Sequence, residues 1–429
     1  MTIFDELESE VRGYCRDYPC IFTRSQNATI TDTDGNEYID FLGGAGTLNY
    51  GHNNPEIKKT VIDYLTDDGV LHGLDMHTSA KQRFLEVFRR NILEPRDLDY
   101  KLQFTGPTGT NAVEAAMKLA RKVTGRTNII SFTNGFHGMT LGAVAATGNG
   151  HHRGGANVPL TGTTFMPYDG YFGGSSAESI RMVEKLISDP SSGVDLPAAM
   201  IVETVQGEGG VNTASVAWLR DLQDLCRRHG ILLIIDDIQV GCGRTGTFFS
   251  FEEAEIEPDI ITLSKSLGGI GLPMALVLFK PELDIWAPGE HNGTFRGNKL
   301  AFVAATKAIE LYWSDGRFGA EVRRKGSILR QHLQWIKADH PTLGCQVRGR
   351  GMIYGIEFNH DQAAALVVEE AYKRQLIIEN CGPGGRVLKF LGPLTTPDDQ
   401  LEEGLKRLAD AVAAVAEKIE AEQLQSTAS

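Results

Sequence analysis

The sequence predicts an α/β protein with two domains: a large one built on a mostly parallel, doubly wound sheet, and a smaller α+β one. Between about residues 100 and 280, short apolar runs alternate with helical patterns, which is typical of a sheet covered by helices on both faces. After about residue 300 this alternation stops, which indicates the second domain. We expect an N-terminal segment (1–60) that contributes to the small domain and the site entrance, a large domain (61–300) and a C-terminal small domain (301–429).

The central sheet is expected from four apolar runs of strand length. A helix over residues 112–123 should precede them, because Ala112, Ala116 and Leu119 lie on one face at helical spacing. Gly125 is expected to end this helix. The four expected strands are 128–132, 199–204, 231–235 and 260–263.

The C-terminal part has a different pattern. A long helix is expected over residues 300–313, and residues 347–349 and 352–358 suggest a small sheet. Two helices should close the chain, at 363–375 and 398–422, and the second is amphipathic and rich in charges.

Composition and charge exclude several classes of protein. With 429 residues, 41% hydrophobic and 23% charged, the chain reads as an ordinary globular protein. A net charge of −13 disfavours nucleic acid or an anionic membrane as a partner. The six cysteines show no C-x-x-C spacing, the start has no secretory signal, and no apolar run approaches the roughly 20 residues that cross a bilayer. We therefore expect a cytoplasmic protein.

Lys265 and Asp236 are the most informative pair of residues. Each follows or ends an apolar strand, and Lys265 enters a glycine-rich turn. A lysine amine can form a Schiff base with the aldehyde of pyridoxal phosphate, and a carboxylate can hold the pyridine nitrogen protonated so that the ring accepts electrons. The pair therefore predicts an enzyme that uses pyridoxal phosphate, bound by the large domain.

Further polar and aromatic residues follow the other expected strands. Ligands of open α/β sheets bind beyond the carboxyl ends of the strands. Phe136 and His137 follow the first strand, Glu203 follows the second, and Gln239 follows Asp236. We expect these residues to line the cofactor site.

The cofactor phosphate requires a helix N-terminus, where free N–H groups and the helix dipole favour an anion. The segment Gly106-Pro107-Thr108-Gly109-Thr110 leads into the alanine-rich helix and supplies it. The alternative is a simple N-cap and turn.

Taken together, these motifs resemble the class III aminotransferases in order and spacing over nearly the whole chain. The resembling segments are Thr108-Gly109-Thr110, Phe136-His137-Gly138, Glu203 with Gln206-Gly207-Glu208-Gly209-Gly210, Asp236-Asp237-Ile238-Gln239, Gly243-Arg244-Thr245-Gly246, Ser264-Lys265 and Gly293-Thr294-Phe295.

The resemblance implies fold type I of the pyridoxal phosphate enzymes and a role for each matching residue. Gly109 and Thr110 would bind the phosphate, Phe136 would stack on the ring and Gln239 would bond the ring hydroxyl. Lys265 would form the internal aldimine and Asp236 would pair with the ring nitrogen. Thr294 would reach the phosphate of a neighbouring subunit, which implies a homodimer or a higher homo-oligomer with shared active sites.

Within the class, segments 43–53, 72–78, 104–114 and 290–298 resemble the diaminobutyrate–2-oxoglutarate transaminases of ectoine biosynthesis. This implies transfer of an amino group from glutamate to aspartate 4-semialdehyde, giving 2,4-diaminobutyrate and 2-oxoglutarate. Asn49 and Tyr50 are expected to line the substrate site.

One position departs from the related ω-aminotransferases, in which an arginine binds the α-carboxylate and a glutamate masks it. Glu208 matches the glutamate, but Lys389 replaces the arginine. We hypothesise that Lys389 binds the α-carboxylate of glutamate while Glu208 gates it, with Arg296 as a second donor. The alternative is a structural lysine near the surface.

Other functions remain open at this point. The same chemistry would serve an aminotransferase for ornithine, 4-aminobutyrate or similar amines, and a non-catalytic protein that binds pyridoxal phosphate is a further alternative. No metal site is expected, since the eleven histidines show no H-x-x-x-H pair flanked by acidic ligands.

Overall fold

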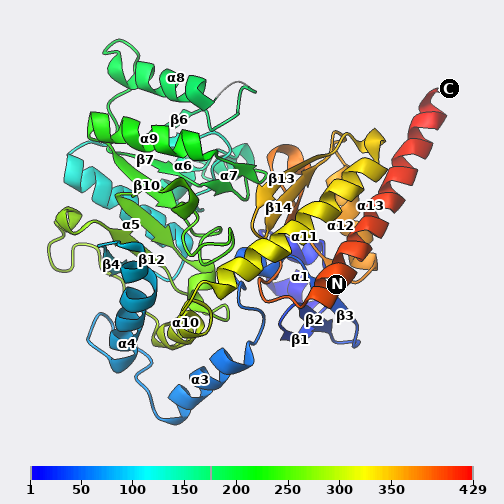
Figure 1. The fold of residues 1–429 in the computed structure, drawn as a ribbon, viewed down its shortest axis with the longest axis horizontal. Coiled ribbons are helices and arrows are strands. Elements are labelled where there is room, and N and C mark those ends of the chain that lie inside the picture. The colour runs from blue at the N-terminus through cyan, green and yellow to red at the C-terminus, as the bar shows by residue number, and fades with distance from the viewer. Residues whose placement is uncertain (1, 174–175, 428–429) are drawn as a thin grey trace.

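The structure is a computed structural model and describes residues 2–173 and 176–427. Figure 1 shows two parts, and the larger is built on one seven-stranded sheet. The order of its strands is β4 (Lys101–Phe104), β12 (Leu276–Phe279), β11 (Ile260–Leu263), β10 (Leu232–Asp236), β7 (Ala199–Val202), β5 (Ile129–Phe132) and β6 (Thr163–Met166).

The predicted α/β fold with a mostly parallel sheet is confirmed. β10 pairs in parallel with β11 and β7, and β5 pairs in parallel with β7 and β6. Only β12 runs against its two neighbours in this sheet, β11 and β4. The four expected strands are β5, β7, β10 and β11, with ends shifted by at most two residues.

Helices cover both faces of this sheet, and alternate strand residues point to the two sides. Ile234 of β10 packs with α5 (Gly109–Thr124) and α6 (Leu141–Ala146). Leu233 and Ile235 pack on the other side with α4 (Ser79–Phe88), α8 (Ser176–Ser188), α9 (Val216–His229) and α10 (Lys299–Tyr312). The apolar stripe expected on residues 112–123 is buried in α5, which ends at Gly125 with φ +68°.

The smaller part holds a second sheet, ordered β13 (Gln346–Arg350), β14 (Ile353–Glu357), β17 (Val387–Phe390) and β16 (Glu379–Cys381). Its helices are α11 (Arg317–Asp339), α12 (Ala363–Lys373) and α13 (Asp398–Thr427). Figure 1 shows α11 running between the two parts and α13 along the far side.

The N-terminal strands lie with this smaller part. β1 (Phe22–Gln26), β2 (Thr29–Asp32) and β3 (Glu37–Asp40) form a sheet with β15 (Leu376–Ile377), which pairs in parallel with β3. By contrast, α10 packs against α3 (Pro55–Thr66) and α4 in the larger part, although it begins close to residue 300. The domain limits given above stay a prediction.

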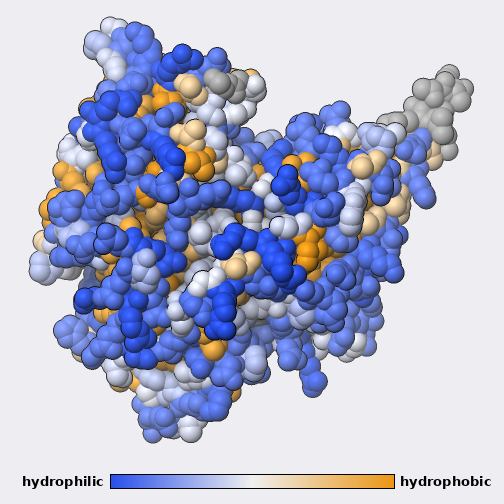
Figure 2. Space-filling model, in the orientation of Figure 1, coloured by the Kyte–Doolittle hydropathy of each residue, from blue (hydrophilic) through white to orange (hydrophobic). Residues whose placement is uncertain are grey.

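The remaining α-helices and strands are short: α1 (Ile3–Leu7), α2 (Gly43–Gly46), α7 (Gly150–Gly154), β8 (Val205–Gln206) and β9 (Asn212–Thr213). Among the described residues, no helix has both the length and the apolar character that a membrane span requires. In Figure 2 hydrophilic side chains cover most of the visible face, and apolar ones are scattered between them.

Candidate active site

Asp236 and Lys265 lie at the same edge of the large sheet. β10 ends at Asp236 and its neighbour β11 ends at Leu263, two residues before Lys265. The two strands run in parallel, with Asp236 opposite Thr262. Their carboxyl ends therefore present both side chains to one cavity, as is usual for ligand sites of open α/β sheets.

The backbone around Lys265 is held in an unusual conformation. Lys265 has φ +49°, in the left-handed region that costs energy for a residue with a side chain. Both neighbours are anchored: Ser264 Oγ donates to Met274 O at 2.7 Å, and Ser266 Oγ donates to Gly46 O at 2.7 Å. These bonds fix the direction in which the lysine side chain leaves the turn.

The Lys265 side chain is half-buried at the edge of the sheet. Its Nζ donates to Ala45 O at 2.9 Å, and burial lowers the pKa of the ammonium. A lowered pKa favours the neutral amine, which is the form that attacks a carbonyl and accepts a proton.

Ala45 belongs to a left-handed turn that sequence reasoning did not identify. Residues 43–46, Gly-Gly-Ala-Gly, all have positive φ values. A Cβ at Gly43 would lie 2.4 Å from Leu391 O, so a larger residue would push this turn away from the chain behind it. The run of three glycines around one alanine was the available signal.

Three polar groups contact the two carboxylate oxygens of Asp236. His137 Nδ1 lies 2.7 Å from Asp236 Oδ2, while Thr262 Oγ1 (3.1 Å) and the Ile238 N–H (3.2 Å) donate to Oδ1. His137 is itself placed by its N–H, which donates to Thr147 Oγ1 at 3.0 Å. The imidazole therefore positions the carboxylate that should meet the pyridine nitrogen.

Glu203 follows β7 and accepts the Phe136 N–H at 2.9 Å, which joins two of the expected cofactor residues. Burial and then the nearby charge of Asp236 raise the pKa of Glu203 well above its ordinary value. A neutral carboxyl beside the charged Asp236 avoids placing two negative charges together in a buried site.

Lys389 is fully buried, which is unlike a structural lysine near the surface. Its Nζ donates to Glu208 at 2.7 Å and lies 3.1 Å from Glu379 Oε1. Burial alone would raise the pKa of Glu208, but the charges of Lys389 and Lys265 outweigh it and lower that pKa to about 2. Sequence reasoning missed Glu379, which faces Lys389 across strands β16 and β17.

Gln239 connects the charged cluster of Glu208, Glu379 and Lys389 to Lys265. Its Nε2 donates to Glu208 at 2.8 Å and to Ala45 O at 3.1 Å, so it touches the acceptor that Lys265 also uses. Its Oε1 is buried without a hydrogen-bond partner among the described residues. A buried unpaired oxygen is costly unless a ligand supplies a donor.

These residues enclose a cavity of about 240 Å³. Its lining joins the start of α5 with the four strand ends: Thr108, Gly109, Thr110, Phe136, His137, Gly138, Met139, Glu203, Glu208, Asp236, Ile238, Gln239 and Lys265. The lining provides an amine, a carboxylate, an aromatic face and a helix N-terminus, which suit the aldehyde, the ring nitrogen, the ring and the phosphate of pyridoxal phosphate. Gln239 Oε1 adds a hydrogen-bond acceptor that has no donor among the described residues. The residues present therefore fit this cofactor.

The phosphate end of the cavity is formed by the first turn of α5. The Thr110 hydroxyl lies 2.7 Å from the Thr140 hydroxyl, which donates to Glu114 at 2.6 Å. The Thr140 N–H also donates to Thr110 Oγ1, at 3.3 Å. Backbone N–H groups at Gly109 and Thr110 remain those best placed to meet an anion at this helix end.

Asn49 and Tyr50 do not line this cavity. Asn49 is buried, donates to Cys242 O at 3.0 Å and accepts from Arg244, while the Tyr50 hydroxyl accepts from Trp313 Nε1 at 3.0 Å. The polar atoms of both side chains form hydrogen bonds inside the core. The substrate role expected for these two residues, which lie in the resembling segment 43–53, stays a prediction; within one chain their side chains make packing contacts.

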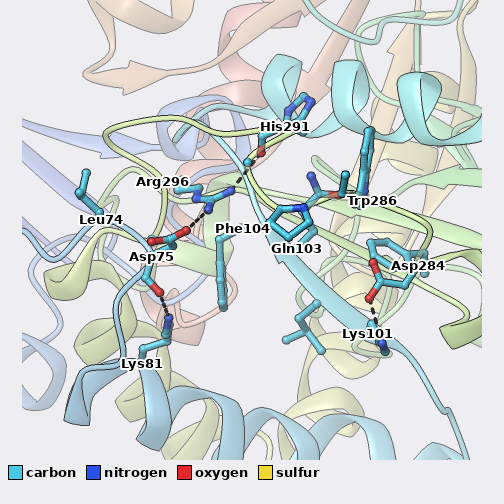
Figure 3. A pocket seen from close by; sticks show the side chains of 16 residues that line it. Leu74, Asp75, Lys81, Lys101, Gln103, Phe104, Asp284, Trp286, His291 and Arg296 are labelled. Atoms are coloured by element: carbon cyan, nitrogen blue, oxygen red, sulfur yellow. Dashed lines mark hydrogen bonds and ion pairs between the residues drawn. The ribbon is translucent and has the colours of Figure 1, made fainter. Parts of the chain in front are cut away.

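Arg296 and Thr294 lie in other cavities of the same chain. Figure 3 shows Arg296 donating to Asp75 and to the His291 carbonyl in a cavity of about 360 Å³ that also contains Phe104 and Trp286. Thr294 lines a third cavity with Pro107 and Pro273. Within one chain, neither residue lines the cavity around Lys265.

Asp237 does not line the cavity. Burial raises the pKa of its carboxyl to about 7. Since the folded pKa exceeds the ordinary value of 3.8, the folded chain binds this proton more tightly than the unfolded chain. Its contribution to stability is full below about pH 4 and is lost as pH rises through 7.

We therefore expect Asp237→Asn to flatten the dependence of stability on pH. Between about pH 5.5 and 8.5 the unchanged chain should lose roughly 2 kcal/mol through this carboxyl, and the variant should not. Thermal unfolding at both pH values measures this. Equal losses in the two proteins would show that Asp237 titrates normally.

Comparisons with known proteins agree with this geometry. The aminotransferase class III family profile matches residues 14–412. The diaminobutyrate–2-oxoglutarate transaminase of Bordetella parapertussis is 58% identical over 96% of this chain and 95% of its own length. That of Halalkalibacterium halodurans is 53% identical over 97% of both chains. The ornithine aminotransferase of Toxoplasma gondii superposes with a TM-score of 0.84 at 26% identity, over 97% of this chain and 94% of that one.

Proposed function

Since the chain belongs to the class III aminotransferases, which depend on pyridoxal phosphate, we propose that it transfers an amino group between L-glutamate and L-aspartate 4-semialdehyde. The products would be L-2,4-diaminobutyrate and 2-oxoglutarate. The observation that carries this proposal is the 53–58% identity, over at least 96% of the chain, to relatives with that activity in their names.

The chain's own residues have distinct parts in this reaction. When bound, the cofactor supplies the aldehyde that accepts the amino group and a ring that takes up electrons from the substrate carbon. Lys265 Nζ would take the proton from that substrate carbon and deliver it to the cofactor carbon, as base and then acid. Asp236, placed by His137, would hold the ring nitrogen protonated, and Phe136 would cover one face of the ring.

The amino donor and the amino acceptor must use the site in turn, because the carbonyl product of the donor leaves, without its amino group, before the acceptor enters. A steady-state assay with diaminobutyrate and 2-oxoglutarate varied together should give parallel double-reciprocal lines, with glutamate as product. Ornithine, 4-aminobutyrate and lysine serve as alternative donors. If one of these reacts with a higher kcat/KM than diaminobutyrate, the class stands and the proposed substrate is wrong.

Lys389 is proposed to bind the α-carboxylate of glutamate after Glu208 moves away from it. Support comes from its complete burial and its 2.7 Å bond to Glu208, which itself lines the cavity. A lysine offers a compact charge rather than the two-pronged contact of arginine.

We expect Lys389→Ala to raise the glutamate concentration needed for half-maximal conversion of the bound cofactor by roughly 10- to 100-fold, since a charge-assisted hydrogen bond is lost. Stopped-flow measurement of the glutamate half-reaction gives this value. Lys185→Ala, which removes an exposed lysine from α8, is the control. An unchanged glutamate half-reaction would remove Lys389 from the carboxylate site.

The assembly is proposed to be a homodimer or a larger homo-oligomer with shared active sites. Near Thr294 the surface is apolar: Phe295 is 71% exposed, and Leu71 and Leu74 are exposed as well. Such a patch favours burial against a second copy, which would bring Thr294 to the neighbouring phosphate site. A single-chain mass in sedimentation analysis of the holoenzyme would contradict this.

The proposed cellular setting is the cytoplasm, where the enzyme would carry out the first step of ectoine biosynthesis in osmoadaptation. All six cysteine thiols are free, which suits a reducing compartment. Loss of ectoine in a strain that lacks this chain, with recovery on supplying diaminobutyrate, tests the pathway assignment.

A further inference from the structure

The left-handed turn at residues 43–46 meets the Lys265 segment through two consecutive carbonyls. Ala45 O accepts from Lys265 Nζ at 2.9 Å, and Gly46 O accepts from Ser266 Oγ at 2.7 Å. Both contacts join parts of the chain that are 220 residues apart. The position of the turn therefore sets where the Lys265 amine and the next residue lie.

A single carboxylate holds the start of this turn. Asp40 is 1% exposed at the end of β3, and its Oδ1 accepts the N–H groups of Leu42 and Gly43, both at 2.8 Å. Its Oδ2 lies 2.7 Å from His52 Nε2. Hydrogen bonds from backbone N–H groups are stronger when the acceptor is charged. Asp40 therefore fixes the direction in which the chain enters the turn.

The turn has no room to shift toward the end of β17. The Leu391 N–H donates to Phe41 O at 2.8 Å, and a Cβ at Gly43 would lie 2.4 Å from Leu391 O. All four residues of the turn have φ values between +55° and +84°, a region that glycine adopts at little cost. Ala45 also lies there, at +55°, so the contacts around the turn must hold it in place.

A backbone carbonyl suits an amine that must both accept and give up a proton. When a substrate amine takes the place of Lys265 on the cofactor carbon, the lysine leaves as a free amine and must stay close to act as base. An amine that donates to a carbonyl keeps its lone pair for the substrate proton. A carboxylate in the place of Ala45 O would favour the charged ammonium, which has no lone pair.

We propose that Asp40 is a positioning residue, which holds the turn at 43–46 so that the Ala45 carbonyl receives the Lys265 amine whenever this amine is not bonded to the cofactor. The proposal rests on the proposed function, in which Lys265 leaves and rejoins the cofactor carbon. Asp40 does not line the cavity around Lys265. It acts on the reaction only through the turn.

The test compares Asp40→Ala with the unchanged chain in two measurements. The first mixes the full chain, freed of cofactor, with pyridoxal phosphate and follows the visible band that forms as Lys265 Nζ adds to the aldehyde carbon and water leaves. The second is the stopped-flow half-reaction of the holoenzyme with diaminobutyrate and with glutamate. We expect the capture rate and both maximal rates to fall roughly 10- to 100-fold, because a displacement of about 1 Å costs rate on this scale.

Binding should be unaffected, which distinguishes a positioning role from a role in binding. Half-saturating concentrations of both amines should stay within about threefold. The affinity for pyridoxamine phosphate, which has no aldehyde and forms no bond with Lys265, should not change either. Asp40→Asn keeps an oxygen that can accept the Leu42 and Gly43 N–H groups, so it should recover most of the lost rate.

Asp32 provides a matched control in the same sheet. It is 3% exposed, and its Oδ1 accepts the N–H groups of Asp34 and Asn36, at 3.0 and 2.9 Å, in the turn between β2 and β3. Asp32→Ala should lower the unfolding temperature, as Asp40→Ala should. It should leave the capture rate and both maximal rates within about threefold of the unchanged chain.

The possible outcomes are distinct. Rates in Asp40→Ala equal to those of the unchanged chain, or reduced no further than in Asp32→Ala, would overturn the role of Asp40. Unchanged maximal rates with raised half-saturating concentrations would also overturn it, since the turn would then act in binding. If Asp40→Ala does not fold, Gly43→Ala is judged by the same criteria, because its added methyl group would push the turn away from Leu391 O.

The same measurements test the proposed substrate separately. A holoenzyme that converts glutamate but not diaminobutyrate would overturn the substrate alone. The capture rate and the glutamate half-reaction would then decide the role of Asp40, with the same expected losses.

Discussion

Replacing Lys265 by alanine is expected to reduce turnover by roughly 10⁴-fold or more, the largest effect of any substitution in this chain. Two functions are lost together: the amine that carries the cofactor covalently, and the base that moves the proton between substrate and cofactor carbons. Steady-state formation of glutamate from diaminobutyrate and 2-oxoglutarate measures the loss. The visible absorption band of the bound cofactor should shift in the same variant.

Two controls narrow the interpretation of that loss. Lys265→Arg keeps a positive charge in the cavity but stays protonated near neutral pH, so it should be about as inactive as Lys265→Ala. Lys185→Ala removes a lysine that is 79% exposed and should be fully active. Activity of Lys265→Ala within tenfold of the unchanged enzyme would show that another group performs the proton transfer.

Replacing Asp236 by asparagine should give the second largest effect, roughly a 10²- to 10³-fold fall in kcat with the cofactor still bound. The asparagine can keep the contacts with Thr262 and the Ile238 N–H, but it carries no charge to hold the pyridine nitrogen protonated. Stopped-flow half-reactions with glutamate and diaminobutyrate should slow together, because both depend on the same ring.

Asp237, the residue directly after Asp236 and β10, provides a matched control. Asp237 lies outside the cavity and accepts the Ser250 N–H at 3.0 Å, so Asp237→Asn should leave both half-reactions within about threefold. A loss in Asp237→Asn equal to that in Asp236→Asn would mean that the effect comes from disturbing the end of β10.

Much of the large sheet, and the residues that line the cavity at its edge, could be predicted because their signals are local. The runs 128–132, 231–235 and 260–263 are apolar and bounded by turns, and the expected site residues directly follow them. Strands β4 and β6 were not predicted, since their short runs mix polar and apolar residues, and the short apolar run of β12 was not assigned to a strand either. The antiparallel direction of β12 depends on how the chain crosses the sheet, which local sequence does not encode.

The contacts within the charged cluster of Glu208, Glu379 and Lys389 could not be predicted from the sequence. Glu379 and Lys389 are ten residues apart in the chain but directly opposite in the sheet, and that register is set by tertiary pairing. Likewise, the carbonyl of Ala45 meets Lys265 across 220 residues. A pattern of residue types cannot show which backbone carbonyl faces a side chain, so neither contact was predicted.

This site is proposed to move an amino group between a diamino acid and 2-oxoglutarate. The most direct test is the visible spectrum of the purified holoenzyme, recorded as diaminobutyrate and then 2-oxoglutarate are added. We expect the band of the bound cofactor to disappear with diaminobutyrate and to return with 2-oxoglutarate, and neither change to occur in Lys265→Ala. A band that diaminobutyrate leaves unchanged, in an enzyme that still responds to glutamate, would contradict the account.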